Sequence, residues 1–181
     1  MSELGTRYER VAAGFSSRLD LVPEDRWESP SPCDQWSARE VVAHSAAVHR
    51  NVVGMVGVKV DQDHIPGDAA AAWHQAADLV LGALADSEIA AAKVASRAGP
   101  MTFEELAATL LTADTLVHTW DLSRAVGLDE QLDQDAVAAV HAYLLPRAEQ
   151  MRVPGGFGPE VSPPPGADPQ TRLLSFTGRR P

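Results

Sequence analysis

Apolar residues recur at intervals of three and four along most of this chain, which is the spacing that buries one face of an α-helix. From Ser2 to Leu21 the stripe consists of Leu4, Tyr8, Val11, Phe15 and Leu19. Comparable stripes predict three further helices, over residues 37–56, 67–86 and 102–126. Four amphipathic helices of similar length form a four-helix bundle, so the pattern predicts an all-α fold.

Residues at the helix ends support these bounds. The sequences Ser37-Ala-Arg-Glu40 and Thr102-Phe-Glu-Glu105 are capping boxes, in which the hydroxyl caps the first turn and the glutamate reaches back to the cap residue. Gly127 is suited to end the fourth helix, because glycine readily adopts the left-handed conformation found there. The second and fourth helices therefore have defined starts.

The segments between the bundle helices show less periodicity. Residues 23–37 contain three prolines and are predicted to form a linker whose packing residues are Trp27, Cys33 and Trp36. Residues 89–101 alternate polar and small apolar side chains and contain a Gly-Pro turn, which indicates a short strand or an irregular crossover.

Beyond the bundle, the sequence predicts one additional helix and an extended tail. The helical pattern from Asp133 to about Met151 contains Pro146, which is expected to kink or end it. Residues 154–181 are rich in proline and glycine and are predicted to be extended, docking through the apolar residues of 173–176.

Length and charge narrow the class of protein. At 181 residues, positions 1–181 are expected to form a single domain with a sufficient core. The net charge of −10 and the lack of a Lys/Arg cluster argue against binding to nucleic acid or to anionic membranes. The single cysteine, Cys33, excludes an intrachain disulfide, and no signal peptide or transmembrane run is evident, so we expect a cytoplasmic protein.

Three ionisable residues share one face of the predicted fourth helix. Asp114 and His118 lie one turn and about 40° apart, and Asp121 falls about 20° from Asp114 around the helix axis. Their neighbours are mostly apolar, so these side chains need partners. They either bind a cation or pair with each other. In the second case the i,i+4 ion pair would stabilise the helix by only about 0.3–0.5 kcal/mol.

The second helix offers a third ligand. His44 lies within the apolar stripe of that helix and is expected to point into the bundle; the stripe is Val41, His44 or Ser45, Val48, Val52 and Met55. With Asp114 and His118 it supplies two imidazoles and one carboxylate, as in catalytic zinc sites with an open fourth position; iron, nickel or manganese also suits this set. The alternative for His44 alone is a buried histidine that hydrogen-bonds a backbone carbonyl.

Other candidate ligands and nucleophiles have simpler interpretations. Cys33 lies in the proline-rich linker without a histidine nearby in sequence, so it is interpreted as a buried packing thiol. Glu40 is four residues before His44, but its capping box explains it. The remaining histidines are interpreted as surface or packing residues: His49, His64, His74 and His141.

Three blocks of the sequence resemble a known family. They are Ser31-Pro-Cys-Asp-Gln-Trp-Ser-Ala-Arg-Glu-Val-Val-Ala-His44, Asp114-Thr-Leu-Val-His-Thr-Trp-Asp-Leu122 and Leu173-Leu-Ser-Phe-Thr-Gly-Arg179. Together they resemble the actinobacterial metal-binding branch of the mycothiol-dependent maleylpyruvate isomerase group, within the DinB-like superfamily. The resemblance implies a DinB-like four-helix bundle. It also implies a divalent metal, usually zinc, on His44, Asp114 and His118.

The resemblance further implies a chemistry. The isomerases of this group have Glu where this chain has Asp114, and they have a second, C-terminal domain that we do not expect here. The expected activity is therefore thiol transfer, the reaction of the wider superfamily, or an isomerase-like reaction. The metal would hold a low-molecular-weight thiol such as mycothiol as thiolate, which attacks an electrophilic small molecule. Asp121 would orient His118 or take the thiol proton.

A different class of function is the alternative. A non-catalytic metal- or ligand-binding bundle, serving as a sensor or an interaction module, would be favoured by a fourth protein ligand from Asp121 or Cys33. An exposed apolar helix face would indicate a homodimer, but periodicity alone does not identify one.

Overall fold

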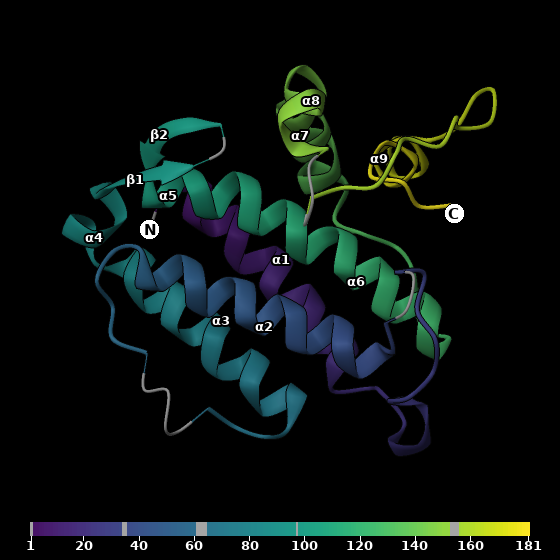
Figure 1. The fold of residues 1–181 in the computed structure, drawn as a ribbon, viewed down its shortest axis with the longest axis horizontal. Coiled ribbons are helices and arrows are strands. Elements are labelled where there is room, and N and C mark those ends of the chain that lie inside the picture. The colour runs from purple at the N-terminus through teal and green to yellow at the C-terminus, as the bar shows by residue number, and fades with distance from the viewer. Residues whose placement is uncertain (1, 34–35, 61–64, 97, 153–155) are drawn as a thin grey trace.

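Four long helices lie side by side in a bundle (Figure 1). The computed structural model describes residues 2–181 except 34–35, 61–64, 97 and 153–155. Both α1 and α2 pack against α3 and α6, so the four helices close around one core. The all-α prediction is confirmed. The bundle helices are α1 (Glu3–Leu19), α2 (Ala38–Gly54), α3 (Ala69–Ala85) and α6 (Thr112–Val126).

The predicted capping residues form the predicted caps. The hydroxyl of Ser37 accepts from the N–H of Glu40, and the Glu40 carboxylate accepts from the N–H of Ser37 at 2.7 Å. Thr102 and Glu105 form the same reciprocal pair. Gly127 ends α6 in the left-handed conformation, with φ of 79°. These local signals therefore fix where the site-bearing helices begin and end.

The helix predicted over residues 102–126 contains a wide turn. It consists of α5 (Phe103–Leu106), a π-helical turn (Ala107–Leu111) and α6. The N–H of Thr112 donates to the carbonyl of Ala107, five residues back. A π-turn absorbs one extra residue, so the residues after it lie about 100° from where a uniform α-helical period would place them. A uniform 3.6-residue period does not reveal this turn, which sets the face from which α6 projects its side chains.

A small hairpin follows α3. The short helix α4 (Ser87–Ala91) leads into β1 (Lys93–Ser96), which pairs antiparallel with β2 (Gly99–Thr102), Lys93 opposite Thr102 and Ser96 opposite Gly99. Of the two predictions for residues 89–101, the strand is therefore correct from Lys93 onward, whereas residues 89–91 belong to α4. The proline-rich linker contains a 3-10 turn, Glu24–Arg26.

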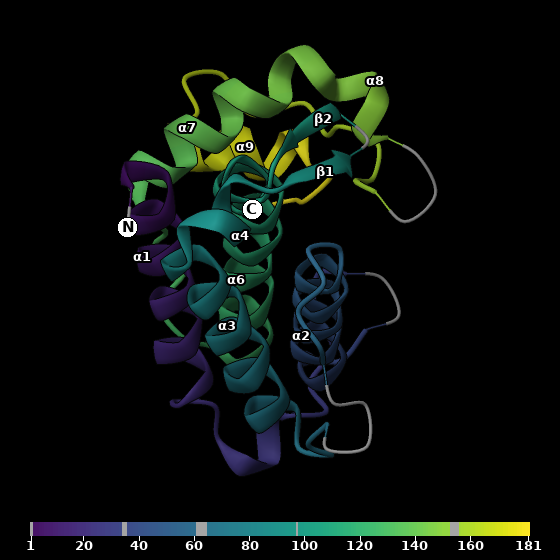
Figure 2. The ribbon, with the colours of Figure 1, turned by 90° about the vertical axis from the view of Figure 1, so that its left-hand side faces the viewer.

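The helix predicted from Asp133 to Met151 is interrupted at its proline. It divides into α7 (Gln134–Leu144), a 3-10 turn (Leu145–Arg147) that contains Pro146, and α8 (Ala148–Met151). Proline has no N–H to continue the hydrogen-bond ladder, as expected. Figure 2 shows α7 and α8 lying across the top of the bundle helices.

The tail contains a helix that the sequence pattern did not predict. Within 154–181, predicted as extended, Pro169–Phe176 form α9, while the start of this segment lies outside the described residues. Asp168 caps the helix by accepting from the N–H of Thr171 at 3.0 Å, and Pro169 occupies the first turn, where its missing N–H costs nothing. The predicted docking residues are buried: Leu173, Leu174 and Phe176.

Among the described residues, the core consists of two apolar clusters. The larger fills the bundle and includes Phe15, Trp73 and Phe103. The smaller lies between α6, α7 and α9 and includes Trp120 and Leu144. The second cluster attaches the C-terminal elements to α6, the helix that carries two of the candidate ligands.

The buried face of α2 differs from the predicted one. The predicted stripe passed through His44 or Ser45, Val48, Val52 and Met55, but Val48 and Val52 are only partly buried and Met55 is 48% exposed. The fully buried side of α2 is centred on a neighbouring line of residues: Val41, Val42, Ser45, Ala46, His49 and Val53. His44 therefore lies at the edge of the core, and not within it.

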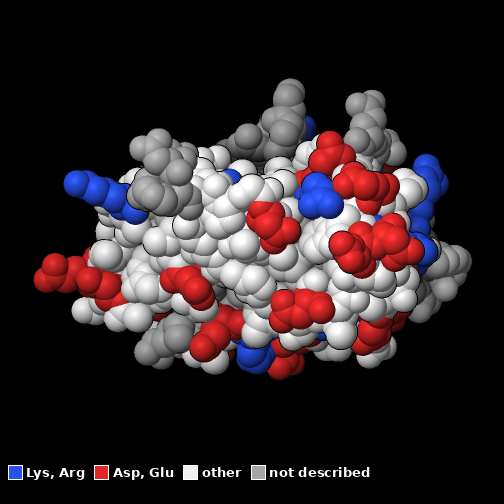
Figure 3. Space-filling model, turned by 90° about the horizontal axis from the view of Figure 1, so that it is seen from below, with Lys and Arg blue, Asp and Glu red and all other residues white. Residues whose placement is uncertain are grey.

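The surface is predominantly acidic on the face shown in Figure 3. Carboxylates are scattered over this face, with few lysine or arginine side chains among them, as the net charge of −10 predicts. No helix in the described part of the chain combines the length and the apolar character that crossing a bilayer requires.

Candidate metal centre

The three predicted ligands converge at the interface of α2 and α6. His44 Nε2 lies 3.5 Å from Asp114 Oδ1, and His118 Nε2 lies 3.6 Å from the same oxygen. The ligand atoms of the three residues are all within 4.8 Å of one another. In a tetrahedral site with bonds of about 2.1 Å, ligand atoms are about 3.4 Å apart. The three side chains therefore suit a single divalent ion.

The second oxygen of Asp114 supports the same interpretation. Asp114 Oδ2 is buried and has no hydrogen-bond partner among the described residues. A buried carboxylate oxygen without a partner is costly in a folded protein and calls for an explanation. A cation between Asp114 and the two imidazoles would provide one.

A hydrogen bond to Asp121 fixes the orientation of the His118 ring. Its Nδ1 donates to Asp121 Oδ2 at 2.9 Å, which leaves Nε2 facing Asp114. Asp121 is fully buried and is held in turn by Arg179, whose Nε and Nη2 donate to its two oxygens at 3.2 and 2.7 Å. A carboxylate behind a metal-binding histidine fixes the ring and its tautomer.

The charges of these groups are strongly coupled. Burial lowers the pKa of His118, but Asp114, Asp121 and Cys33 outweigh it and raise that pKa to about 10. Burial raises the pKa of Asp121, but His118 and Arg179 bring it down to about 2. The pKa of Asp114 is also lowered, because His118 and His44 outweigh its burial. A proton and a cation therefore compete for Nε2 of His118.

Cys33 does not have the predicted surroundings. Its Sγ donates to Asp121 Oδ2 at 3.2 Å and accepts from Arg179 Nη2 at 3.0 Å, and the side chain is only partly buried. With His118 and Asp121 it forms a second group of ligand atoms within 4.8 Å. The interpretation as a buried packing thiol is therefore wrong. The linker brings Cys33 to a histidine 85 positions later in the chain.

Arg179 belongs to this site, although it was singled out from the sequence only as the last residue of the third resemblance block, with no role predicted for it. It follows α9, so the tail reaches back to α6 and closes the polar network behind His118. The signal in the sequence was the predicted burial of Asp121, which requires a cationic or hydrogen-bonding partner that the local sequence does not supply.

A cavity of about 750 Å³ opens in front of the three ligands. His44, Asp114 and His118 all line it, and the ring of Trp36 lies beside His44 with centroids 4.6 Å apart. The remaining walls come from α2, α5 with the π-turn, β1, the segment after α8 and the C-terminal residues. The candidate ligands therefore face a space of the size that binds small molecules.

The other histidines and Glu40 do not contribute to this centre. His49 is fully buried, with Nδ1 2.7 Å from the Ser45 carbonyl and Nε2 3.3 Å from Thr115 Oγ1, and burial lowers its pKa to about 4. It is a packing residue, as predicted. His74 lies near the surface beside Asp20, His141 packs on Phe176, Glu40 caps α2, and His64 lies outside the described residues.

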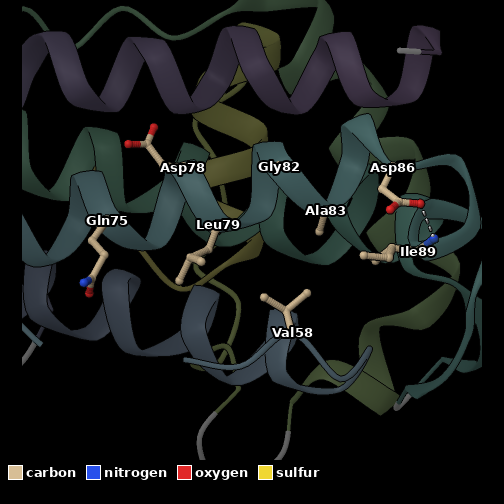
Figure 4. Close-up of a pocket in the computed structure, with 8 residues that line it drawn as sticks. All are labelled: Val58, Gln75, Asp78, Leu79, Gly82, Ala83, Asp86 and Ile89. Atoms are coloured by element: carbon tan, nitrogen blue, oxygen red, sulfur yellow. Dashed lines mark hydrogen bonds between the residues drawn. The ribbon is translucent and has the colours of Figure 1, made fainter. Parts of the chain in front are cut away.

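A second hollow, of about 460 Å³, lies between α3 and Val58 (Figure 4). Its two carboxylates are Asp78 and Asp86, and Asp86 accepts from backbone N–H groups as the cap of α4. Neither belongs to a ligand group among the described residues. Metal chemistry is therefore better supported at His44, Asp114 and His118.

Comparison with known proteins agrees with this geometry. A family model described as the mycothiol maleylpyruvate isomerase N-terminal domain matches residues 8–123, more than half of the chain. The match contains all three candidate ligands and Asp121, and it ends before α7. Two uncharacterized proteins of Mycobacterium tuberculosis, MT0763 of strain CDC 1551 and Rv0738 of strain H37Rv, are each 29% identical over 181 residues, covering 95% of both chains. No solved structure matches the chain.

Proposed function

The chain belongs to the family of mycothiol maleylpyruvate isomerase N-terminal domains, and from this premise we propose that it is a metal-dependent enzyme acting with a low-molecular-weight thiol of the mycothiol type. The thiol sulfur is transferred to an electrophilic small molecule: the S–H proton leaves, an S–C bond forms, and the leaving group departs with its bonding electrons. An isomerase-like reaction, in which the sulfur adds and is released again, needs the same groups.

The observation that carries this proposal is the one-sided arrangement of the ligands. His44, Asp114 and His118 all line the cavity, and neither Asp121 nor Cys33 joins their ligand group among the described residues. Three protein ligands with an accessible side are typical of catalytic sites, whereas structural zinc sites are closed by four. Zinc is the metal we expect, and nickel, iron or manganese would suit the same donors.

A divalent ion held by these residues would lower the pKa of a bound thiol from about 8.5, so that the nucleophilic thiolate is present at neutral pH. The protein's own contribution is to position the ligand side chains. Asp121 holds the ring of His118 so that Nε2 faces Asp114, and Trp36 borders His44 at the edge of the cavity.

Of the two roles predicted for Asp121, we favour orienting His118. Asp121 Oδ2 already accepts hydrogen bonds from His118, Arg179 and Cys33, and the pKa of the carboxyl is lowered to about 2. A fully buried carboxylate that is paired and weakly basic is a poor acceptor for a thiol proton. Asp121 is therefore a positioning residue, and the thiol proton leaves through the open side of the cavity to solvent.

Metal content tests the proposal first. Elemental analysis of untagged protein purified without chelators is expected to give about one divalent ion per chain, lost in Asp114→Ala. Asp78→Ala, the same change in the hollow of Figure 4, is the matched control and keeps the ion. Absence of metal from the wild type after reconstitution would overturn the proposal.

Thiol binding tests the second step. In protein reconstituted with Co²⁺, N-acetylcysteine is expected to produce a sulfur-to-cobalt charge-transfer band in the near ultraviolet. A cobalt spectrum that N-acetylcysteine and larger cysteinyl thiols leave unchanged would favour the non-catalytic metal-binding bundle instead.

A further inference from the structure

An apolar groove leads away from the metal centre along α2. On one wall, Val48, Val52 and Met55 follow His44 at intervals of four, four and three residues, so they form one line on the helix. Leu106, Leu110 and Leu111, from α5 and the π-turn, line the same cavity. Eleven residues of helix correspond to about 16 Å, which is the length of the groove from His44 to Met55.

The groove borders the packed core, with Leu106 and Leu111 buried and the other four side chains less so. Val48, Val52 and Leu110 are only partly buried, and Met55 is 48% exposed, although all four are aliphatic or thioether side chains. The π-turn contributes to the groove, because Leu110 and Leu111 both line the cavity although they are adjacent in sequence. A continuous apolar surface of this kind beside a reactive centre is typical of a ligand site.

The charges around the cavity restrict the ligand further. Arg179 is the only arginine or lysine among the described residues that line it. All three guanidinium nitrogens are engaged: Nε and Nη2 with Asp121, Nη2 also with Cys33, and Nη1 with the Thr177 carbonyl. A second anionic group on a substrate would therefore meet no available cation, and Asp114 would repel it.

We propose that the electrophile of this enzyme is an uncharged small molecule whose elongated apolar group, an alkyl or aryl chain, lies in the groove between Val48, Val52, Met55, Leu106, Leu110 and Leu111. The proposal specifies the substrate class of the proposed function and therefore rests on it. Dicarboxylates, the acids that the family name suggests, are excluded as good substrates, because the groove offers them neither a cation nor polar partners among its described residues.

Equilibrium binding of apolar probes tests the proposal without turnover. N-phenyl-1-naphthylamine, which is uncharged and fluoresces in apolar sites, is expected to bind and to be displaced by 1-hexanol, 1-octanol and 1-decanol. Affinity should rise about three- to fourfold per methylene. Fumarate at the same concentrations should displace nothing. Affinity that does not change with chain length, or displacement by fumarate equal to that by 1-decanol, would overturn the proposal.

Two groove variants locate the binding. Met55→Glu places a charge at the exposed end of the groove, where folding tolerates it, and is expected to weaken 1-decanol at least fivefold. Val52→Phe keeps the wall apolar but narrows the groove, and is expected to weaken 1-decanol more than 1-hexanol. The matched control is Leu145→Glu, which changes an apolar side chain that is 58% exposed outside the cavity. Equal effects of Met55→Glu and Leu145→Glu would contradict the assignment.

One further variant separates this inference from the proposed function. Asp114→Ala removes a metal ligand but leaves the groove, so it is expected to lose metal and keep the affinity for 1-decanol within about threefold. Failure of the metal test with retained alkanol binding would reject the enzyme proposal alone. Retained metal without chain-length dependence would reject the groove as the substrate site alone.

Discussion

His118 and His49 are both buried histidines at the contact between α2 and α6, yet they have opposite properties. His118 lies between Asp114 and Asp121, and its pKa is raised to about 10 against the effect of burial. His49 contacts the Ser45 carbonyl and the Thr115 hydroxyl, and burial lowers its pKa to about 4. The partners, and not the residue type or its depth, decide which histidine belongs to the candidate metal centre.

The largest expected effect is on metal binding. Removing a ligand with His44→Ala or His118→Ala should weaken metal affinity about a thousandfold or more, because two protein ligands do not hold the ion. His49→Ala should keep the ion, since His49 lies outside the ligand group. Metal analysis after dialysis against a weak chelator distinguishes these results. Full metal content in both ligand variants would show that the site is elsewhere.

The next effect concerns acid stability, which His49 should control. Its folded-state pKa of about 4 lies below the unfolded value of 6.5, so the unfolded chain binds the proton more tightly and stability falls as pH drops through this window. The loss between pH 7 and pH 5 should be about 2 kcal/mol.

Urea denaturation at both pH values measures this loss. His49→Gln should show a smaller fall than wild type, and His74→Gln, at a more exposed histidine, should match wild type. The same fall in all three proteins would mean that other groups cause the acid dependence.

Asp121→Asn tests whether the Asp121 carboxylate is needed to hold the His118 ring in position. The amide keeps the shape but loses the charge that fixes the ring and pairs with Arg179, so metal affinity should fall about 10- to 100-fold. Competition with a chromophoric chelator measures this change, with Asp78→Asn as the matched carboxylate control. Unchanged affinity in Asp121→Asn would show that the His118 ring is held by its packing alone.

The smallest effect is the release of a proton on metal binding. Because the pKa of His118 is raised to about 10, the ring is protonated at neutral pH and must lose its proton to offer Nε2. Metal affinity should therefore rise about tenfold per pH unit around neutrality, with about one proton released per ion. Calorimetry in buffers of different ionisation enthalpy counts the proton. Binding without proton release would mean that His118 is already neutral.

Much of the site could be predicted because its ligands lie on regular helices. The i,i+4 spacing of Asp114 and His118 fixes their relation within α6, and the assumption of a bundle was enough to bring His44 to them. Capping boxes defined the helix starts for the same reason: each is a local pattern with a local geometry.

The rest depends on contacts that no local pattern encodes. Cys33 and Arg179 approach Asp121 from irregular segments 88 and 58 residues away. The groove was mistaken for core, because Val48 and Val52 have the same spacing as core residues and a sequence does not show which apolar line of a helix faces another helix and which faces a cavity. The helix in the tail was missed because the proline- and glycine-rich composition of residues 154–181 was interpreted as evidence for an extended chain, although Pro169 begins α9.

The π-turn at Ala107–Leu111 also bears on how this site could change by insertion and deletion. One residue removed from the turn would restore an ordinary helix, and because the wide turn absorbs one extra residue, the helical segments on either side would keep their orientation. Asp114 and His118 would still face His44 and the cavity. A single-codon deletion there would thus renumber the ligands of α6 while leaving the centre assembled, so family members with and without this residue should be compared with a gap placed at the turn.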